Sequence, residues 1–355
     1  MLFASDNWSG AVDAVIAAIV DAARETHAAY GADRLTAELQ QRFSDLFERE
    51  VAVLPVGTGT AANALAISAF CRPGSVVFGH AQAHILVDET NAVALLGGGA
   101  RIVGIDGADG KLTARSLSEA LDRFPAGFVH HGQPVAVSLS QITELGLAYT
   151  TDEIAAVASV AKARGMAVHV DGARFAGAVA GLGRSPAELT WKAGVDVLSF
   201  GGTKNGCLAA EAIVFFDPDR AADTRYARQR IGHGFSKEWL IAAQLLAYLD
   251  EDRWLQLARH ANRMAARLAE VLRAGPDSRL AFAPAANEVF AIISDSLDAR
   301  LRSAGAIYYP WSTDGVPPAA RPGAGEVLIR LVTSFQTKAD DIDRLAAIVA
   351  PGWKG

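Results

Sequence analysis

The sequence predicts an α/β protein with a mostly parallel sheet covered by helices on both faces, followed by a smaller C-terminal α+β unit. From about residue 51, short apolar runs alternate with amphipathic helical segments. These runs are almost continuously apolar, which is typical of strands buried on both faces. We expect an N-terminal arm with helices over 1–50, a large domain over 51–250, and a linking helix with a small domain over 251–355.

The N-terminal arm begins with a polar loop over 5–10. An Ala- and Val-rich helix is expected next, ending near Thr26, and a second helix extends to Phe47. This region is too short to build a core of its own. We therefore expect it to lie across a partner subunit.

The large sheet is expected to contain seven strands. They correspond to the apolar runs 51–56, 75–79, 101–105, 134–140, 167–171, 195–200 and 212–217. The segments 113–123 and 151–164 between them are predicted amphipathic helices. In parallel sheets of this kind, ligands bind beyond the carboxyl ends of the strands, so we expect the functional site there.

After about Pro218 the chain is predicted to be helical as far as Leu272. The longest helices of this part are expected over 237–249 and 253–272. The small C-terminal unit is expected to contain strands at 289–294, 306–311 and 327–332 and a closing helix over 338–349.

Composition favours a soluble, cytoplasmic enzyme. The net charge of −6 and the absence of a Lys/Arg block argue against a nucleic-acid-binding protein. Cys71 and Cys207 lie in no CxxC or Cys/His cluster, so we expect neither a disulfide framework nor a metal site. The apolar runs are too short to span a membrane. The first residues, MLFASDNWSG, lack the basic segment of a secretory signal.

Lys204 is the residue around which the functional prediction is built. It lies in the segment GGTKNG over 201–206, directly after the predicted strand 195–200. A solvated loop lysine is one interpretation. The other is an amine partly buried at a strand end, where it can form a Schiff base with a carbonyl cofactor.

A second strand end supports the Schiff-base interpretation. The apolar run 167–171 ends in Asp171, and Arg174 follows three residues later. A carboxylate that faces a pyridine nitrogen keeps this nitrogen protonated, and an arginine can hold the ring hydroxyl or a substrate carboxylate. The alternative is a structural Asp–Arg pair. Together with Lys204, the pattern predicts pyridoxal 5'-phosphate (PLP) as the cofactor.

Three further segments carry candidate residues. Gly59 and Thr60 open a helix after a strand, as in an anion cradle, although a capped strand–helix turn explains them equally well. His84 could lie on a planar cofactor or exchange protons, or belong to a surface helix. Arg330, in the segment IRLVTS, could bind an α-carboxylate or be a solvated strand residue.

With these residues in place, the chain resembles the threonine aldolase family of PLP enzymes, in particular its bacterial low-specificity L-threonine aldolase and L-phenylserine aldolase branch. The resemblance extends over nearly the whole chain. Its motifs are SDN at 5–7, YGAD at 30–33, GTAAN at 59–63, AHILVDE at 83–89, DGARF at 171–175, SPAELTWKAGVDVLSFGGTKNG at 185–206 and RLVTS at 330–334. The long block that contains Lys204 is very specific.

The resemblance implies a PLP enzyme of fold type I (aspartate-aminotransferase-like), usually a tetramer of two dimers with active sites at the dimer interface. It implies that Lys204 binds the cofactor, that Asp171 faces the pyridine nitrogen and that His84 stacks on the ring. Gly59 and Thr60 would hold the phosphate. Arg174, Arg330 and Ser5 would hold the ring hydroxyl and the substrate carboxylate.

Two segments depart from the family pattern. Where many members carry GGGMRQ, this chain has GHGFSK over 232–237, so Lys237 would replace an arginine that reaches a phosphate. Where many members have a histidine near the substrate hydroxyl, this chain has Glu144. The base for the β-hydroxyl proton is therefore open among His84, Glu89, Glu144 and a water.

The resemblance implies cleavage of L-threonine, L-allo-threonine or phenylserine-like β-hydroxy-α-amino acids to glycine and an aldehyde. Two alternatives remain: another PLP reaction, such as β-elimination, racemisation or transamination, and a PLP-binding protein without turnover. The aromatic residues Trp8, Tyr30, Phe175 and Tyr308 could shape a pocket for an aryl aldehyde, although each could equally belong to a core or an interface.

Overall fold

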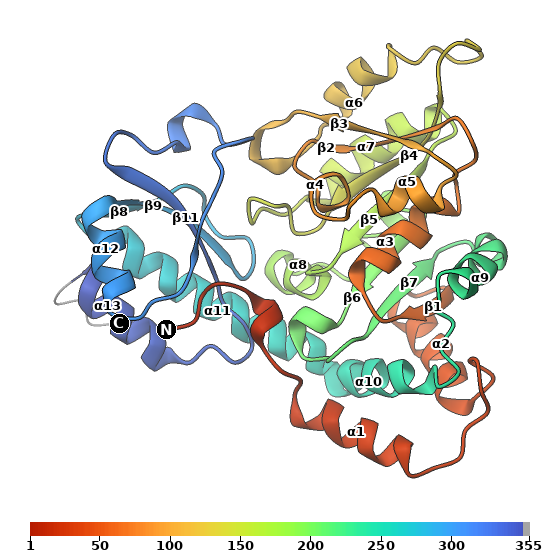
Figure 1. Ribbon diagram of the computed structural model, residues 1–355, viewed down its shortest axis with the longest axis horizontal. Coiled ribbons are helices and arrows are strands. Elements are labelled where there is room, and N and C mark those ends of the chain that lie inside the picture. Colours follow the sequence, from red (N-terminus) through yellow and green to blue (C-terminus); the bar gives the residue numbers. More distant parts are fainter. Residues whose placement is uncertain (351–355) are drawn as a thin grey trace.

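The computed structural model describes residues 1–350, and two sheets organise this part of the chain (Figure 1). The larger sheet has the strand order β1-β7-β6-β5-β4-β2-β3, and the smaller one has the order β10-β11-β9-β8. In the larger sheet β7 runs antiparallel to β1 and β6, whereas the other neighbouring pairs are parallel. The smaller sheet is antiparallel throughout.

All seven runs predicted for the larger sheet form strands, and their ends shift by at most two residues. The bounds are β1 Ala52–Val56, β2 Ser75–His80, β3 Arg101–Ile105, β4 Gln133–Ser140, β5 Ala167–Gly172, β6 Val197–Gly201 and β7 Glu211–Phe215. The smaller sheet contains β8 Ser278–Leu280, β9 Glu288–Ser294, β10 Tyr309–Pro310 and β11 Glu326–Val332.

Helices cover both faces of the larger sheet and one face of the smaller one. Their bounds are α1 Asp13–Ala23, α2 Arg34–Leu46, α3 Gly59–Ser68, α4 His84–Val87, α5 Ala92–Leu96, α6 Ala114–Leu121, α7 Thr151–Ala163, α8 Phe175–Leu182, α9 Ala221–Arg230, α10 Trp239–Leu249, α11 Arg253–Ala274, α12 Asp295–Ser303 and α13 Ala339–Val349. No helix within residues 1–350 is long and apolar enough to cross a membrane.

The larger sheet is the middle layer of three. Helices α3, α4, α5 and α9 pack on one face, and α1, α2, α6, α7, α8 and α10 pack on the other. In β6, Val197 contributes to the core beneath α3, while Leu198 and Phe200 contribute to the opposite core. Burial on both faces explains why these strands are almost continuously apolar.

The first residues of the chain belong to the core of the smaller unit. Phe3 is fully buried there, among residues of α11, α12 and α13. Its N–H donates to the carbonyl of Ile307 at 2.8 Å, and its carbonyl accepts from the N–H of Val332 at 2.8 Å. Figure 1 shows the chain running along the smaller sheet before it crosses to α1.

This arrangement corrects one predicted strand. Of the segment 306–311, only Tyr309–Pro310 pair with β11. Ile307 instead forms a parallel bridge with Leu2 and hydrogen bonds with the N-terminal segment. The sequence pattern could not reveal this, because an apolar residue suits either partner equally well.

Replacing Phe3 with alanine should destabilise the smaller unit, because it opens a cavity in a closed core. Such changes typically cost about 3–5 kcal/mol. We expect a clearly lower urea midpoint for Phe3→Ala than for the wild type. Leu2→Ala is the matched control, because the Leu2 residue is 61% exposed, and its midpoint should stay near the wild-type value. Equal shifts for both variants would contradict this packing.

Candidate active site

A cavity of about 710 Å³ lies where the carboxyl ends of the larger sheet's strands face the smaller sheet. Its wall contains residues that follow β1, β2, β4, β5 and β6, together with Glu288 at the start of β9 and Arg330 of β11. Most of the predicted site residues line it: Ser5, Gly59, Thr60, His84, Glu89, Glu144, Asp171, Arg174, Lys204 and Arg330. The cavity therefore lies at the edge of the sheet that the strand pattern indicated.

Lys204 enters this wall because two glycines allow β6 to end in a tight turn. A Cβ at Gly201 would lie 2.6 Å from the carbonyl oxygen of Ala173, and one at Gly202 would lie 2.6 Å from that of Ala210. A 3-10 turn over Thr203–Asn205 follows. The Asn205 amide anchors this turn by donating to Tyr248 Oη at 2.6 Å and to the carbonyl of Trp254 at 2.9 Å.

Asp171 ends β5 with both carboxylate oxygens engaged. Oδ1 accepts from the N–H of Ala173 at 3.0 Å, and Oδ2 accepts from Asn63 Nδ2 at 2.8 Å. Asn63 lies on α3, above the face of the sheet towards which Asp171 points. The Asp171 residue is 8% exposed and borders the same cavity as Lys204.

Asn63 also joins Asp171 to a histidine–glutamate pair. Its Nδ2 donates to Glu89 Oε1 at 2.7 Å, and His84 Nδ1 lies 2.8 Å from the same oxygen. The hydrogen bond with Glu89 raises the pKa of His84, although burial opposes this. Burial raises the pKa of Glu89, although its bonds to His84 and Asn63 oppose this. The pair thus fixes the imidazole ring at the cavity wall.

Glu144 follows β4 and is tied to the segment that carries His84. Its Oε1 accepts from the N–H of His84 at 3.0 Å and from Ser140 Oγ at 2.7 Å. Burial raises the pKa of Glu144 to about 7.

A second carboxylate, Glu211 at the start of β7, accepts from the N–H of Gly202 at 3.2 Å. Burial raises the pKa of Glu211 to about 7 as well, although a hydrogen bond from Thr203 and the charge of Lys204 oppose this.

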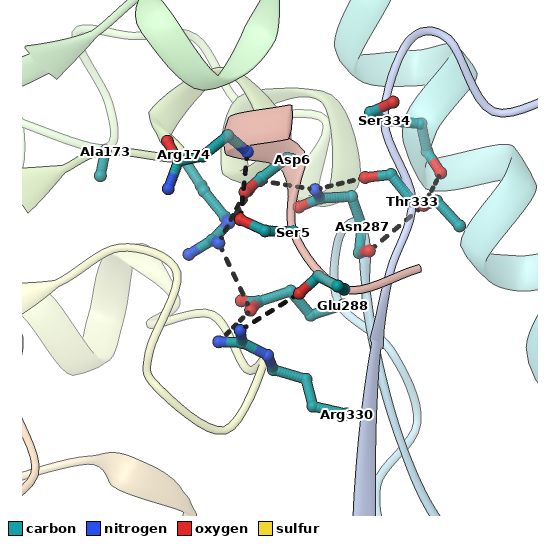
Figure 2. Close-up of polar contacts among 12 residues, drawn as sticks. Ser5, Asp6, Ala173, Arg174, Asn287, Glu288, Arg330, Thr333 and Ser334 are labelled. Carbon is teal, nitrogen blue, oxygen red and sulfur yellow. Dashed lines mark hydrogen bonds and ion pairs between the residues drawn. The ribbon is translucent and has the colours of Figure 1, made fainter. Parts of the chain in front are cut away.

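Two partly buried arginines and two buried acids connect the larger sheet to the smaller one (Figure 2). Arg174 binds Asp6 through two hydrogen bonds of 2.8 and 2.9 Å. Glu288 Oε1 lies 3.6 Å from Arg174 Nη2 and 3.6 Å from Arg330 Nη1. The Arg330 guanidinium lies 4.1 Å from the centre of the Trp311 ring. Ser5, beside Asp6, completes this side of the cavity (Figure 2).

The charges of this group support one another. Burial alone would raise the pKa of Asp6, but the charges of Arg174 and Lys204, together with the hydrogen bonds from Arg174 and Asn287, outweigh it and lower this pKa. Burial alone would lower the pKa of Arg174, but Asp6 and Glu288 raise it. Burial dominates at Arg330 and lowers the pKa of that guanidinium. Of these groups, we therefore expect the Arg330 guanidinium to be stabilised most when a negatively charged ligand binds next to it.

Two of the predicted site residues do not line this cavity. Tyr30 lies in the loop between α1 and α2 and is 62% exposed. The second is Lys237, which is also exposed. The two lie close together, because the N–H of Tyr30 donates to the carbonyl of Ser236 at 3.1 Å.

Nor do Trp8, Phe175 and Tyr308 line the cavity, whose aromatic wall residue is Trp311. Phe175 and Tyr308 are buried in the cores instead.

The sequence reasoning missed several residues that shape the cavity. Asn63 and Asp6 lie in the GTAAN and SDN motifs, but these motifs alone predict no role for either residue. Glu288 and Glu211 are each the first residue of an otherwise apolar strand. A charged residue directly before an apolar run is a weak sequence signal for a functional position. The role of Glu288 in the cavity follows from Arg174 and Arg330, which contact it from distant parts of the chain.

Replacing Asp6 with asparagine should destabilise the protein in a pH-dependent way. The change leaves the partly buried Arg174 without its bidentate counter-charge, and the loss of one partner from such a pair costs up to about 3 kcal/mol. Because the folded state lowers the pKa of Asp6 below 3.8, this contribution is complete at neutral pH. It disappears as the pH falls through 3.8 towards the folded-state pKa.

The measurement is urea unfolding of wild type and Asp6→Asn at pH 7 and at acidic pH. The gap between the two proteins should be large at pH 7 and should shrink on acidification. Asp122→Asn, at an exposed position, controls for the loss of one surface carboxylate. A gap that does not depend on pH would show that the ion pair is not its source.

The chain is similar to several known proteins over most of its length. A family model described as beta-eliminating lyase matches residues 3–296. The low-specificity L-threonine aldolase of Pseudomonas aeruginosa is 41% identical over 314 residues, covering 88% of this chain and 90% of that protein. The enzyme of the same name from a Pseudomonas species is 39% identical over 346 residues, covering 97% and 96%.

Among solved structures, the threonine aldolase of Leishmania major superposes with a TM-score of 0.89 at 26% identity and covers 98% of both chains. The predicted fold class, a fold-type-I α/β architecture with a mostly parallel sheet, is thereby confirmed. The chain belongs to the beta-eliminating lyase family and is a member of the threonine aldolase group that these relatives represent.

Proposed function

We propose that this chain is a PLP-dependent lyase that cleaves β-hydroxy-α-amino acids to glycine and an aldehyde. Its substrates would be L-threonine, L-allo-threonine or phenylserine-like amino acids. One observation carries the proposal: Lys204 and Asp171, from neighbouring strand ends, border a single cavity with the arginine pair Arg174 and Arg330. An amine, a ring-facing carboxylate and a carboxylate-binding site are the groups that such a reaction needs.

The residues present fit PLP. The first N–H groups of α3, at Gly59 and Thr60, have no acceptor within the helix and border the cavity, so they suit a phosphate. A Cβ at Gly59 would meet nothing within 4 Å, which leaves the backbone accessible. Asp171 accepts two N–H bonds, the pattern of an ionised carboxylate. Lys204 would hold the cofactor covalently, and His84 would lie against its ring.

When bound, PLP supplies the electron sink that accepts the electron pair of the breaking Cα–Cβ bond. The chain's own residues bind and orient the substrate. Besides its ion pair with Glu288 and its contact with the Trp311 ring, Arg330 makes one hydrogen bond of 3.5 Å to the carbonyl of Ala4, and its buried Nε has no partner among residues 1–350. It is therefore suited to bind the substrate carboxylate, with Ser5 and Arg174 beside it.

Asp171 holds the proton on the ring nitrogen through its negative charge, and Asn63 keeps this carboxylate in place. On the side of the smaller sheet, Trp311, which follows β10, lines the cavity.

We also propose that the protein acts as a homotetramer with active sites at the dimer interface. Tyr30 and Lys237 lie together on the surface and away from the cavity of their own protomer. Their exposure makes both available to the cavity of a neighbouring protomer, where Lys237 would contact the phosphate and Tyr30 the substrate.

The reaction is tested by incubating the PLP-loaded protein with threonine, allo-threonine and phenylserine, each as both enantiomers. We expect glycine with acetaldehyde or benzaldehyde. Release of ammonia and a keto acid would instead indicate β-elimination, and unchanged substrate would favour a PLP-binding protein without turnover.

The variant Lys204→Ala should abolish both the yellow absorption of bound PLP and aldehyde release, because no other amine is predicted to hold the cofactor. Lys192→Ala, at an exposed position, should retain both properties. If Lys204→Ala kept full activity, the assignment of Lys204 would be wrong.

The variant Arg330→Met should raise the KM for the amino acid by about 10- to 100-fold, the range expected for losing a charge-assisted hydrogen bond. The corresponding β-hydroxy amine, which lacks the carboxylate, should bind to both proteins equally well. Arg273→Met is the control at an exposed arginine of α11. Equal losses for the amino acid and the amine would contradict a role in carboxylate binding.

A further inference from the structure

Glu144 has one carboxylate oxygen fixed and the other without a partner. Oε1 is held by the N–H of His84 and by Ser140 Oγ. Oε2 is buried and has no hydrogen-bond partner within residues 1–350, although Glu144 borders the cavity. A buried oxygen of this kind costs free energy unless something binds it, so it marks a position where a ligand can donate a hydrogen bond.

The loop that carries Glu144 is held from both ends. Gln141 and Tyr149 exchange two hydrogen bonds of 2.8 Å between the Gln141 side chain and the Tyr149 backbone. The backbones of Thr143 and Leu147 are joined by a further bond of 2.8 Å. Leu145 packs against Phe290 of the smaller sheet. The carboxylate is therefore positioned before any substrate arrives, as catalysis requires.

The other candidate bases are more fully engaged. Glu89 also has a buried second oxygen without a partner among residues 1–350, but its Oε1 accepts from both His84 and Asn63, and its charge balances the imidazole ring. His84 uses Nδ1 for Glu89, and this interaction favours the protonated ring, which is not a base. Asp171 has both oxygens occupied. Glu89 and Glu288 pair with His84 and with the two arginines, whereas the free oxygen of Glu144 belongs to a carboxylate that forms no ion pair within residues 1–350.

We propose that Glu144 is the general base that removes the β-hydroxyl proton of the substrate when the Cα–Cβ bond breaks. This inference rests on the proposed aldolase function and adds the residue that starts the cleavage. The O–H bond breaks, its proton moves to Glu144 Oε2, and the oxygen becomes the carbonyl oxygen of the aldehyde. The electron pair of the Cα–Cβ bond, which the cofactor would accept, ends in the new Cα–H bond together with a proton from solvent, and Glu144 returns the hydroxyl proton to water.

The electrostatic surroundings suit this task. Burial raises the pKa of Glu144 to about 7, and the negative charge of Asp171 acts in the same direction. Hydrogen bonds from Ser140 and from the N–H of His84 oppose the shift. Tyr149, the other titratable group at this loop, is held neutral because burial raises its pKa. A base with a pKa close to neutral pH is the most effective one at that pH.

The test compares two reactions of the PLP-loaded enzyme. Cleavage of phenylserine or threonine needs the β-hydroxyl proton to be removed, whereas exchange of the glycine α-proton in D₂O does not. Glu144→Gln keeps an acceptor for His84 and Ser140 but cannot take a proton. We expect its kcat for cleavage to fall by about 10²- to 10⁴-fold. Glycine exchange and the absorption of bound PLP should stay close to wild type.

Two further variants sharpen this comparison. Glu50→Gln, at an exposed glutamate, controls for the loss of one carboxylate and should leave both reactions unchanged. Ser140→Ala removes a hydrogen bond that stabilises the charged form of Glu144, so it should move the acidic limb of the kcat profile to higher pH. In the wild type, kcat for cleavage should fall below a pH of about 7. In Glu144→Gln this limb should be absent.

These measurements test both the role of Glu144 and the proposed aldolase function. The inference is overturned if Glu144→Gln cleaves at nearly the wild-type rate, if cleavage and glycine exchange fall by the same factor, or if the acidic limb persists unchanged. If wild-type enzyme exchanges the glycine proton but cleaves no β-hydroxy amino acid, the proposed aldolase function fails and this inference fails with it. If the wild type cleaves and only the variant result disagrees, the proposed function stands and the assignment of Glu144 falls.

Discussion

The buried charges that join the N-terminus to both sheets are the constraint on which the cavity depends. Asp6 comes from the first residues, Arg174 from the end of β5, Glu288 from β9 and Arg330 from β11. None of the four could be buried alone without a large desolvation cost. Because each is balanced by a neighbour from another segment, the two sheets and the N-terminal segment must stay in register for any of these charges to be buried.

A second network fixes the opposite side of the cavity. Asn63 links Asp171 of β5 to the Glu89–His84 pair that follows β2, and Glu144 after β4 binds the same segment. Further along the sheet, His169 lies between Ser138 and Ser199 at 2.8 and 2.9 Å. Burial lowers the pKa of His169 to about 4, so this ring is a neutral spacer behind Asp171. Rigidity at the strand ends therefore comes from polar side chains as well as from the apolar core.

The strand pattern and the spacing of Lys204 and Asp171 made much of this predictable. Apolar runs buried on both faces indicate a parallel sheet, and a parallel sheet brings its strand ends together at one edge. The residues of the second network follow such ends, so their clustering could be expected from their position in the sequence alone. Glu288 could not be recognised in this way, because its significance comes from two arginines that lie far from it in the chain.

By itself, the sequence determined the fold class, the edge of the sheet where the site would form and the family to which the chain belongs. These features depend on local periodicity and on motifs that stay contiguous along the chain. Only the tertiary structure decided which acids are neutralised and which keep a free oxygen. Burial and pairing are properties of side chains that meet across distant segments, and for this reason Glu144 could be proposed from the four open candidates only once its neighbours were in place.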